Sequence, residues 1–348
     1  MLHSAQQLLA SGLISGHGLE IKTVIAAFLV GIVVGITGMG GGALMTPALI
    51  FLGVGNASAV VTADLAASAF SRTSGAVVHW RQGSPNLKLA FWLIVGSVPA
   101  AFLGPHVLAW FSPAGNLDTL LKLCIGFALL FAASTYAIRL YLQLRQTASG
   151  KRPAEGEPTI RPIPTLFVGL VGGLLVGITS VGAGSVIMIA MLMLYPTLSA
   201  VKLVGTDLVQ AVPLVLSAAA SNILTHGLVW SIVIPLVIGS VPGTILGAKI
   251  APRVPASLIR RGIVVVLTMS GLTLLDQAGW GPFAGNGGHA HPIVIVLVGL
   301  ALVAALPIVW GFLRRGVGLP MFGAPTVAEI EKPPTSKRRR NRAGDKVG

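Results

Sequence analysis

Long apolar runs alternate with short polar breaks along most of the chain. About 20 apolar residues cross the ~30 Å hydrocarbon core of a bilayer as a helix. Runs of roughly this length cover residues 57–80, 88–110, 117–141, 199–225, 228–250, 257–276 and 292–313. Barrel strands would be shorter and would alternate apolar with polar positions. The pattern therefore predicts an all-α polytopic membrane protein.

Two further apolar stretches, residues 21–53 and 164–195, are interrupted by glycine. The first interruption reads GITGMGGGALMTP, residues 35–47. Each stretch has just over thirty residues, or about 48 Å as a straight helix. That length is too long for one comfortable crossing and too short for two. A single crossing and a re-entrant hairpin both remain open on length alone.

The chain contains an internal duplication. GIVVGITGMGGG (31–42) aligns with GLLVGITSVGAG (173–184), and LIVGSVPAAFLG (93–104) aligns with LVIGSVPGTILG (236–247). Each pair is identical at seven of twelve positions, and the offset is 142 residues in the first block and 143 in the second. ADL at 63–65 matches TDL at 206–208 at the same offset of 143. A single repeated unit explains all three matches.

The duplication sets the predicted organisation of the chain. The segments are an N-terminal segment 1–20, a first membrane repeat 21–141, a polar, proline-rich cytoplasmic linker 142–163, a second membrane repeat 164–276, an outer loop 277–291, an extra transmembrane helix 292–313 and a basic cytoplasmic tail 314–348.

Composition supports the membrane class, and charge sets the topology. Of 348 residues, 54% are hydrophobic and 10% are charged, against about 25% charged in soluble domains. The net charge is +14, which we attribute to cytoplasmic loops and lipid contact rather than to nucleic acid. If the two interrupted stretches fold back as hairpins, 21 of the 24 Lys and Arg lie on the cytoplasmic side; single crossings would put fifteen outside. The positive-inside rule favours hairpins, and the two repeats are then inverted with respect to each other.

The glycine-rich tips of these hairpins are the predicted substrate site. A helix that restarts at the membrane midplane has unpaired N–H groups and a partial positive charge at its start. Broken helices at matching places in inverted repeats mark the binding sites of many transporters. The predicted anion-binding residues at the tips are Thr37, Gly38, Gly40, Gly41, Gly42, Thr179, Ser180, Gly182, Gly184 and Ser185.

An alternative is that the glycines only allow helices to pack closely and that the hydroxyls bond to their own helices. This alternative suits Gly31, where we expect alanine to have a milder effect than a bulky residue at Gly41. The tip, in contrast, is expected to have no room for a large side chain at Gly41.

Ionisable side chains inside the predicted spans are few. Asp64 and Asp207 occupy matching positions, and Arg72 lies two turns after Asp64, where the second repeat has Val215. Intramembrane charges usually mark a pathway or a pair, and arginine binds oxyanions in a bidentate manner. We therefore predict that Arg72 binds an anionic substrate and that the two aspartates couple transport to protons. Asp207 is the expected proton carrier, because only Asp64 has an arginine nearby in the sequence. Alternatively, each carboxylate braces a hairpin by hydrogen bonds.

Other chemistry is poorly represented. No phosphate-binding P-loop and no nucleophile with a base at midplane depth is apparent, so we expect neither an enzyme nor a primary pump. The HxH at 289–291 is a weak metal signal, and Cys124 is expected to be a packing residue. No cofactor and no metal are predicted.

The motifs GITGMGGGALMTPALI, ADL and GSVP, with their second copies GITSVGAG, VGTDLVQAVPL and GSVPGTILG, resemble the TauE/SafE sulfite exporter family, also called the toluene sulfonate uptake permease family. The resemblance covers about residues 21–276. It implies a multi-pass permease of the bacterial cytoplasmic (inner) membrane for small sulfur-containing anions such as sulfite, sulfonates or sulfoacetate. The chain departs from the motif at Ala183 and Ile189, which puts the symmetry of the site in doubt.

The leading hypothesis is a secondary transporter, with the anion and the lipid bilayer as its partners and no nucleic acid. A homo-oligomer is compatible with this hypothesis. An anion channel with a re-entrant selectivity element is the alternative. An inverted repeat within one chain favours alternating access over a channel.

Overall fold

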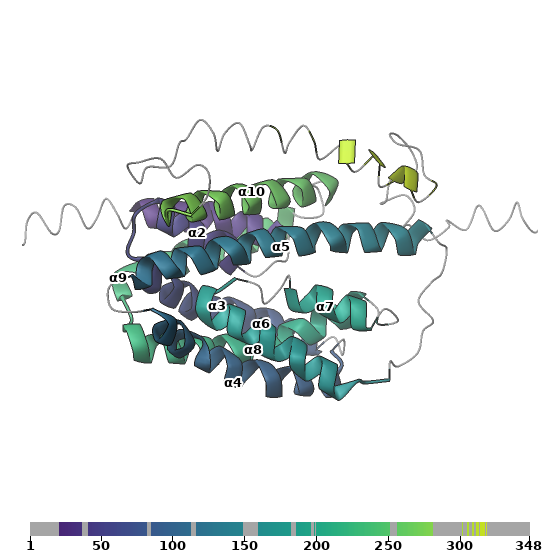
Figure 1. Cartoon of the computed structure of the whole chain (residues 1–348), viewed down its shortest axis with the longest axis horizontal. Coiled ribbons are helices and arrows are strands. Elements are labelled where there is room, and N and C mark those ends of the chain that lie inside the picture. The colour runs from purple at the N-terminus through teal and green to yellow at the C-terminus, as the bar shows by residue number, and fades with distance from the viewer. Residues whose placement is uncertain are drawn as a thin grey trace, which may run out of the picture.

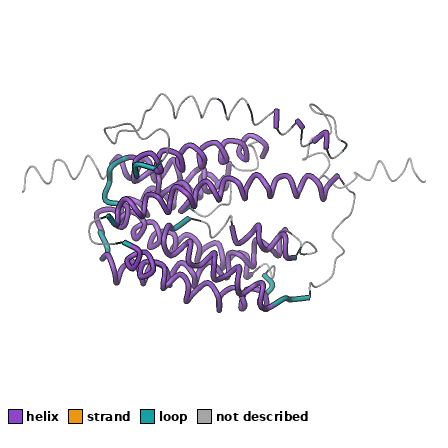
Figure 2. Tube along the Cα trace, viewed as in Figure 1, coloured by secondary structure: helices purple, strands orange, loops and turns teal. Residues whose placement is uncertain are grey.

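In the computed structural model, the described residues form helices and no strand (Figures 1 and 2). It describes residues 21–36, 41–81, 85–112, 116–148, 159–181, 186–195, 198, 200–250 and 256–280, and single residues or short groups between 301 and 318. The predicted segments 1–20 and 277–348, including the extra span 292–313, therefore fall wholly or largely outside the described residues.

The helices lie where the apolar runs predict them. The first repeat forms a helix at Ile21–Ile36, then α2 (Gly42–Phe51), α3 (Ala57–Arg81), α4 (Leu87–Phe111) and α5 (Leu117–Ala148). The second repeat forms α6 (Pro162–Thr179), α7 (Val186–Leu194), α8 (Ala200–His226), α9 (Trp230–Ile250) and α10 (Ala256–Gln277). Among the described residues, five segments are long and apolar enough to cross a membrane, one each in α4, α5, α6, α8 and α9.

One helix is longer than predicted. α5 continues to Ala148, past residue 141 and into the predicted linker. The added turns carry Leu, Gln and Arg, which are good helix formers, so the helix does not need apolar packing to continue.

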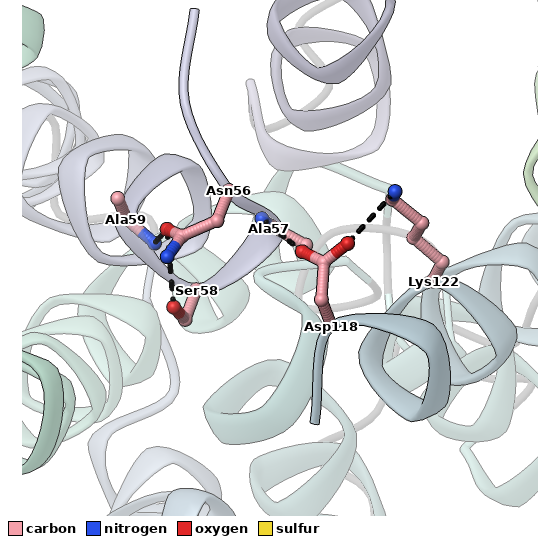
Figure 3. Close-up of polar contacts among 6 residues, drawn as sticks. All are labelled: Asn56, Ala57, Ser58, Ala59, Asp118 and Lys122. Atoms are coloured by element: carbon pink, nitrogen blue, oxygen red, sulfur yellow. Dashed lines mark hydrogen bonds and ion pairs between the residues drawn. The ribbon is translucent and has the colours of Figure 1, made fainter. Parts of the chain in front are cut away.

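Two polar side chains fix the start of α3 (Figure 3). Asn56 Oδ1 accepts hydrogen bonds from the backbone N–H of Ala59 at 3.0 Å and from Ser58 Oγ at 3.3 Å. Asp118, in the first turn of α5, accepts a hydrogen bond from Ala57 N at 2.7 Å and pairs with Lys122 at 2.8 Å. These are the usual interactions of unpaired N–H groups at a helix start. They tie the beginning of α3 to the beginning of α5.

The two repeats interlock through glycines. α6 of the second repeat packs on α4 of the first, where Gly173 lies against Ser97 O and Gly177 lies against Ala101 O with no room for a Cβ. The first repeat returns the same contact, because the helix Ile21–Ile36 packs on α9. There a Cβ at Gly31 would lie 2.7 Å from Ser240 O, and Gly31 is the counterpart of Gly173. Small residues allow backbones to approach this closely.

Residue contacts give the relative directions of the helices. The residue numbers of contacting residues increase together along α4 and α8. Ser217 Oγ donates to Val98 O, and Ser221 Oγ donates to Phe102 O. The two helices are therefore parallel. α5 and α10 are counterparts in the two repeats and pack side by side (Figure 1). Gly126 lies against Leu275, whereas Leu130 lies against Gly271, so α5 and α10 are antiparallel.

The second interrupted stretch folds back on itself. Tyr195, just after α7, accepts a hydrogen bond from the backbone N–H of Arg161 at 2.9 Å and shares one with Thr165 Oγ1 at 2.6 Å. Arg161 and Thr165 lie at the start of α6. Midway along the stretch, Gly172 contacts Ile187 of α7. The stretch therefore ends beside its own beginning, which is the geometry of a hairpin.

Candidate functional site

The two glycine-rich tips meet. Of the predicted tip residues, Gly41, Gly42, Thr179 and Ser180 are described, and Gly42 is so close to the backbone of Ser180 that a Cβ has no room. The remaining predicted residues at the tips, Thr37, Gly38, Gly40, Gly182, Gly184 and Ser185, lie outside the described residues. The start of α2 and the end of α6 thus come together from different repeats.

Asp64 joins the two hairpins. Its Oδ2 accepts hydrogen bonds from Thr46 Oγ1 of α2 at 2.7 Å and from Ser180 Oγ at 2.8 Å. Its Oδ1 accepts a weaker one from Ser68 Oγ at 3.5 Å. The carboxylate is 2% exposed, and a buried charge of this kind must be hydrogen-bonded to be tolerated. One side chain of α3 therefore holds a residue of each interrupted stretch, Thr46 of the first and Ser180 of the second.

Ser180 has an unusual backbone conformation. It caps α6 with φ of 59°, in the left-handed region. Its counterpart in the first repeat is Gly38, the residue type that adopts this conformation without strain. The neighbouring Thr179 Oγ1 instead donates to Leu175 O at 2.7 Å, within its own helix. Of these two predicted hydroxyls, Ser180 therefore reaches across the site and Thr179 serves its own backbone.

Asp207 lies in a different environment. Gln210 Nε2 donates a hydrogen bond to Asp207 Oδ1 at 3.1 Å, and Gln210 Oε1 accepts one from Ser97 Oγ at 3.5 Å. All three side chains are buried. Asp207 thus accepts from an amide one helical turn away, where Asp64 accepts from hydroxyls of two other segments.

Arg72 acts on both aspartates. It is 7% exposed and interacts electrostatically with Asp207 and with Asp64. The sequence places Arg72 near Asp64 alone, and the packing of α3 against α8 brings Asp207 within its range as well. Within the described part of the chain, Arg72 Nε has no hydrogen-bond partner. A buried donor in this condition is available to an anion.

A small cavity lies beside Asp64. Its volume is about 20 Å³, room for about one water molecule. Its lining comes from the helix Ile21–Ile36, α2, α3 and α9, and consists of Gly31, Val34, Gly41, Met45, Asp64, Ala67, Ser68, Leu236, Ser240 and Thr244. An oxyanion needs more space than this.

The structure bears on both glycine predictions. A Cβ added at Gly41 would meet nothing nearer than Ser68 Oγ, at 3.9 Å, so this position has room for a methyl group, and the prediction for a bulky side chain there stays a prediction. Alanine at Gly31 was expected to be the milder change, but its Cβ would lie 2.7 Å from Ser240 O, so the backbone would have to shift. At the tip, Gly42 is the position where a side chain has no room, because its Cβ would overlap the backbone of Ser180. The sequence alone does not show which backbone atoms approach a glycine.

Sequence reasoning missed several residues of the site. Ser68 and Gln210 carry a local signal, because each lies one helical turn after an aspartate. Thr46 carries none, since it is 18 residues from Asp64 and belongs to a different helix. Among the described residues, no three His, Cys, Asp or Glu side chains come close enough to hold a metal ion.

Comparison with known proteins places the chain in a family. The sequence profile of the family "Sulfite exporter TauE/SafE" matches residues 23–274. The chain belongs to the TauE/SafE family. It is 33% identical over 261 residues to the "Probable membrane transporter protein YjnA" of Bacillus subtilis (strain 168), covering 74% of this chain and 100% of that protein.

Other TauE/SafE relatives are similar over nearly their whole length. The "Probable membrane transporter protein YdhB" of the same Bacillus strain is 29% identical, covering 72% of this chain and 98% of its own. A "Probable membrane transporter protein" of Xylella fastidiosa (strain Temecula1 / ATCC 700964) is 28% identical over 92% of its length. No solved structure matches. The chain is thus a multi-pass membrane transporter of the TauE/SafE family.

Proposed function

We propose that this TauE/SafE protein is a secondary transporter of small sulfur-containing anions, such as sulfite, sulfonates or sulfoacetate, in the bacterial cytoplasmic membrane, and that it is coupled to protons. Its partners are the anion and the lipid bilayer. The observation that carries the proposal is the meeting of the two tips over Asp64, with the buried Arg72 acting on both aspartates.

The charges of the site suggest how a proton and an anion travel together. Arg72 with ionised Asp64 and Asp207 gives a net charge of −1, which repels an anion in a medium of low dielectric constant. One proton on either carboxyl makes the cluster neutral. A protonated Asp64 also accepts fewer hydrogen bonds, so the hydroxyls of Thr46 and Ser180 can turn to the anion. These changes favour binding of the anion together with the proton.

The arrangement of the repeats supports alternating access. The first helix of each repeat packs on a helix of the other repeat through matched glycines, Gly31 and Gly173. α5 and α10 run in opposite directions. The return of α7 to the start of α6 supports a re-entrant hairpin. Inverted repeats that bring broken helices together at one site are typical of carriers. These features favour a carrier over an anion channel.

A thermal-shift screen tests the substrate class. A ligand that binds the folded state raises the unfolding temperature by mass action. Sulfite, sulfoacetate and toluene sulfonate are compared with chloride and acetate at equal ionic strength. We expect at least one sulfur anion to stabilise the protein more than the control anions do. Arg72→Gln should remove this difference, and Arg72→Lys should weaken it because lysine lacks the bidentate donor pair. Equal shifts for all anions contradict the proposed substrate class.

A further inference from the structure

The two repeats differ at one position beside the aspartates. Ala67 follows Asp64 by one helical turn, and its counterpart in the second repeat is Gln210, which follows Asp207. Ser240 and Ser97 are also counterparts, from the two GSVP motifs. The first repeat thus sets a methyl group, and the second an amide, beside the corresponding serine.

Ala67 and Gln210 differ in size, and each lies next to an aspartate of the site. Ala67 and Ser240 both line the cavity beside Asp64. In the second repeat, Gln210 bridges Asp207 and Ser97 with its two amide ends and is 0% exposed, as is Ser97. Gln210 is the longer side chain of the matched pair, and its amide Nε2 lies 3.1 Å from Asp207 Oδ1.

We propose that the Gln210 side chain is a seal that keeps water away from Asp207. Water and protons then reach the two aspartates through the cavity beside Asp64. Among the described residues, the charged group acting on Asp64 is Arg72 on its own helix, and the same arginine interacts with Asp207 on α8. α2 and the cavity-lining parts of α9 and of the helix Ile21–Ile36 carry no ionisable side chain.

The inference changes the carboxyl that carries the proton. The sequence alone points to Asp207, because it lacks a matched arginine. In the structure Arg72 acts on both aspartates, so the arginine does not distinguish them. Their immediate neighbours do, since Asp64 lines the cavity whereas Asp207 accepts a hydrogen bond from Gln210. This part of the inference rests on the proposed proton coupling.

Thiol labelling tests the seal without any substrate. Ser240→Cys and Ser97→Cys are made separately in a Cys124→Ala background, and opened membranes are treated with a membrane-impermeant thiol reagent. We expect Ser240→Cys to react about tenfold faster than Ser97→Cys, because reaction at 97 requires the Gln210 side chain, which is hydrogen-bonded to Asp207, to move aside. Adding Gln210→Ala should bring Ser97→Cys to the faster rate, and Ala67→Gln should slow Ser240→Cys.

Gln210→Leu is the matched control. Leucine fills most of the same space without hydrogen bonds, so labelling of Ser97→Cys should stay slow if the seal depends on volume. Size-exclusion chromatography shows which variants remain folded, and the Ser240→Cys and Ser97→Cys comparison needs no change at Gln210. Equal labelling rates in these two proteins overturn the proposal, as does an unchanged rate when Gln210→Ala is added to Ser97→Cys.

Transport with an imposed pH gradient tests the coupling. Asp64→Asn should abolish gradient-driven uptake while anion exchange across the membrane persists, whereas Asp207→Asn should keep a response to the gradient. The opposite result would return the coupling to Asp207 and contradict the inference. If the wild-type protein transports no sulfur anion, the proposed function fails, and the labelling rates still decide whether Gln210 is a seal.

Discussion

At the scale of single residues, Ser180 is the clearest sign of a functional constraint. Among the described residues, Ser180 is the one non-glycine residue with a positive φ. A left-handed conformation costs a residue with a Cβ about 1–2 kcal/mol, and the matching position of the first repeat is a glycine, Gly38. Strained backbone is concentrated at functional sites. The gain here is the hydroxyl that reaches Asp64 across the two repeats.

Two substitutions at Ser180 separate strain from hydrogen bonding. Ser180→Gly removes the strain and the hydroxyl, so its stability should stay within about 1 kcal/mol of wild type. Ser180→Ala keeps the strain and should be less stable. Both should transport poorly. Thermal unfolding and proteoliposome uptake measure the two effects. Thr62→Val is the control, because the Thr62 hydroxyl bonds only to Ser58 O of its own helix. Full transport by Ser180→Gly would remove the hydroxyl from the site.

The two glycines at the start of α2 give a matched pair. Gly42→Ala should unfold or inactivate the protein, because its Cβ would overlap the backbone of Ser180. Gly41→Ala should be tolerated, with its nearest neighbour at 3.9 Å. Expression in membranes, melting temperature and uptake are compared for both. Tolerance of Gly42→Ala together with loss at Gly41→Ala would contradict the described contact between the tips.

At the scale of elements, the second hairpin combines a long helix with a short one. α6 has 18 residues and α7 has nine, so at 1.5 Å per residue they measure about 27 and 14 Å. The short helix begins partway along the long one and ends beside its start, where Tyr195 closes the hairpin. The length of α6 therefore places its last residue, Thr179, and its cap, Ser180, in the buried interior.

The closure by Tyr195 can be measured as a coupling energy. Tyr195→Phe removes the hydroxyl that bonds to Arg161 N and Thr165 Oγ1, and we expect a loss of about 1–2 kcal/mol in unfolding free energy. In a double-mutant cycle with Thr165→Val, the losses should be non-additive by at least about 0.5 kcal/mol. Thr268→Val is the control, since its hydroxyl bonds to Val264 O within its own helix. Strict additivity in the cycle would show that the hydroxyls do not act together.

At the scale of the whole molecule, the sequence predicts the elements better than their contacts. The apolar runs predict the helices because a membrane span needs a fixed number of apolar residues. The partners of Asp64 were not predicted, because Thr46 and Ser180 lie 18 and 116 residues away and meet it only when the repeats pack. The exchange of Ala67 for Gln210 is visible in the alignment, but its meaning depends on which serine each side chain faces.

The inverted topology has a direct test. Cysteines are placed singly at Gly16, Gly150 and Gly344 in a Cys124→Ala background and labelled from either side of the membrane. The cysteine at 16 should be labelled from outside. The cysteines at 150 and 344 should be labelled from the cytoplasm, because the linker 142–163 and the tail 314–348 are basic and the positive-inside rule places them there. Labelling of all three from the same side is incompatible with inverted repeats.

Counterflow in proteoliposomes tests the central claim, that one chain carries a small sulfur anion through a site where its two hairpins meet. Vesicles with the purified protein are loaded with unlabelled sulfite, and the uptake of radiolabelled sulfite is followed, with sulfoacetate in parallel. We predict saturable uptake of at least one of these anions, accelerated by the same anion inside and lost in Arg72→Gln, with Thr62→Val as the folded control. Uptake no faster than in protein-free vesicles, or linear flux that ignores the anion on the other side, would contradict the account.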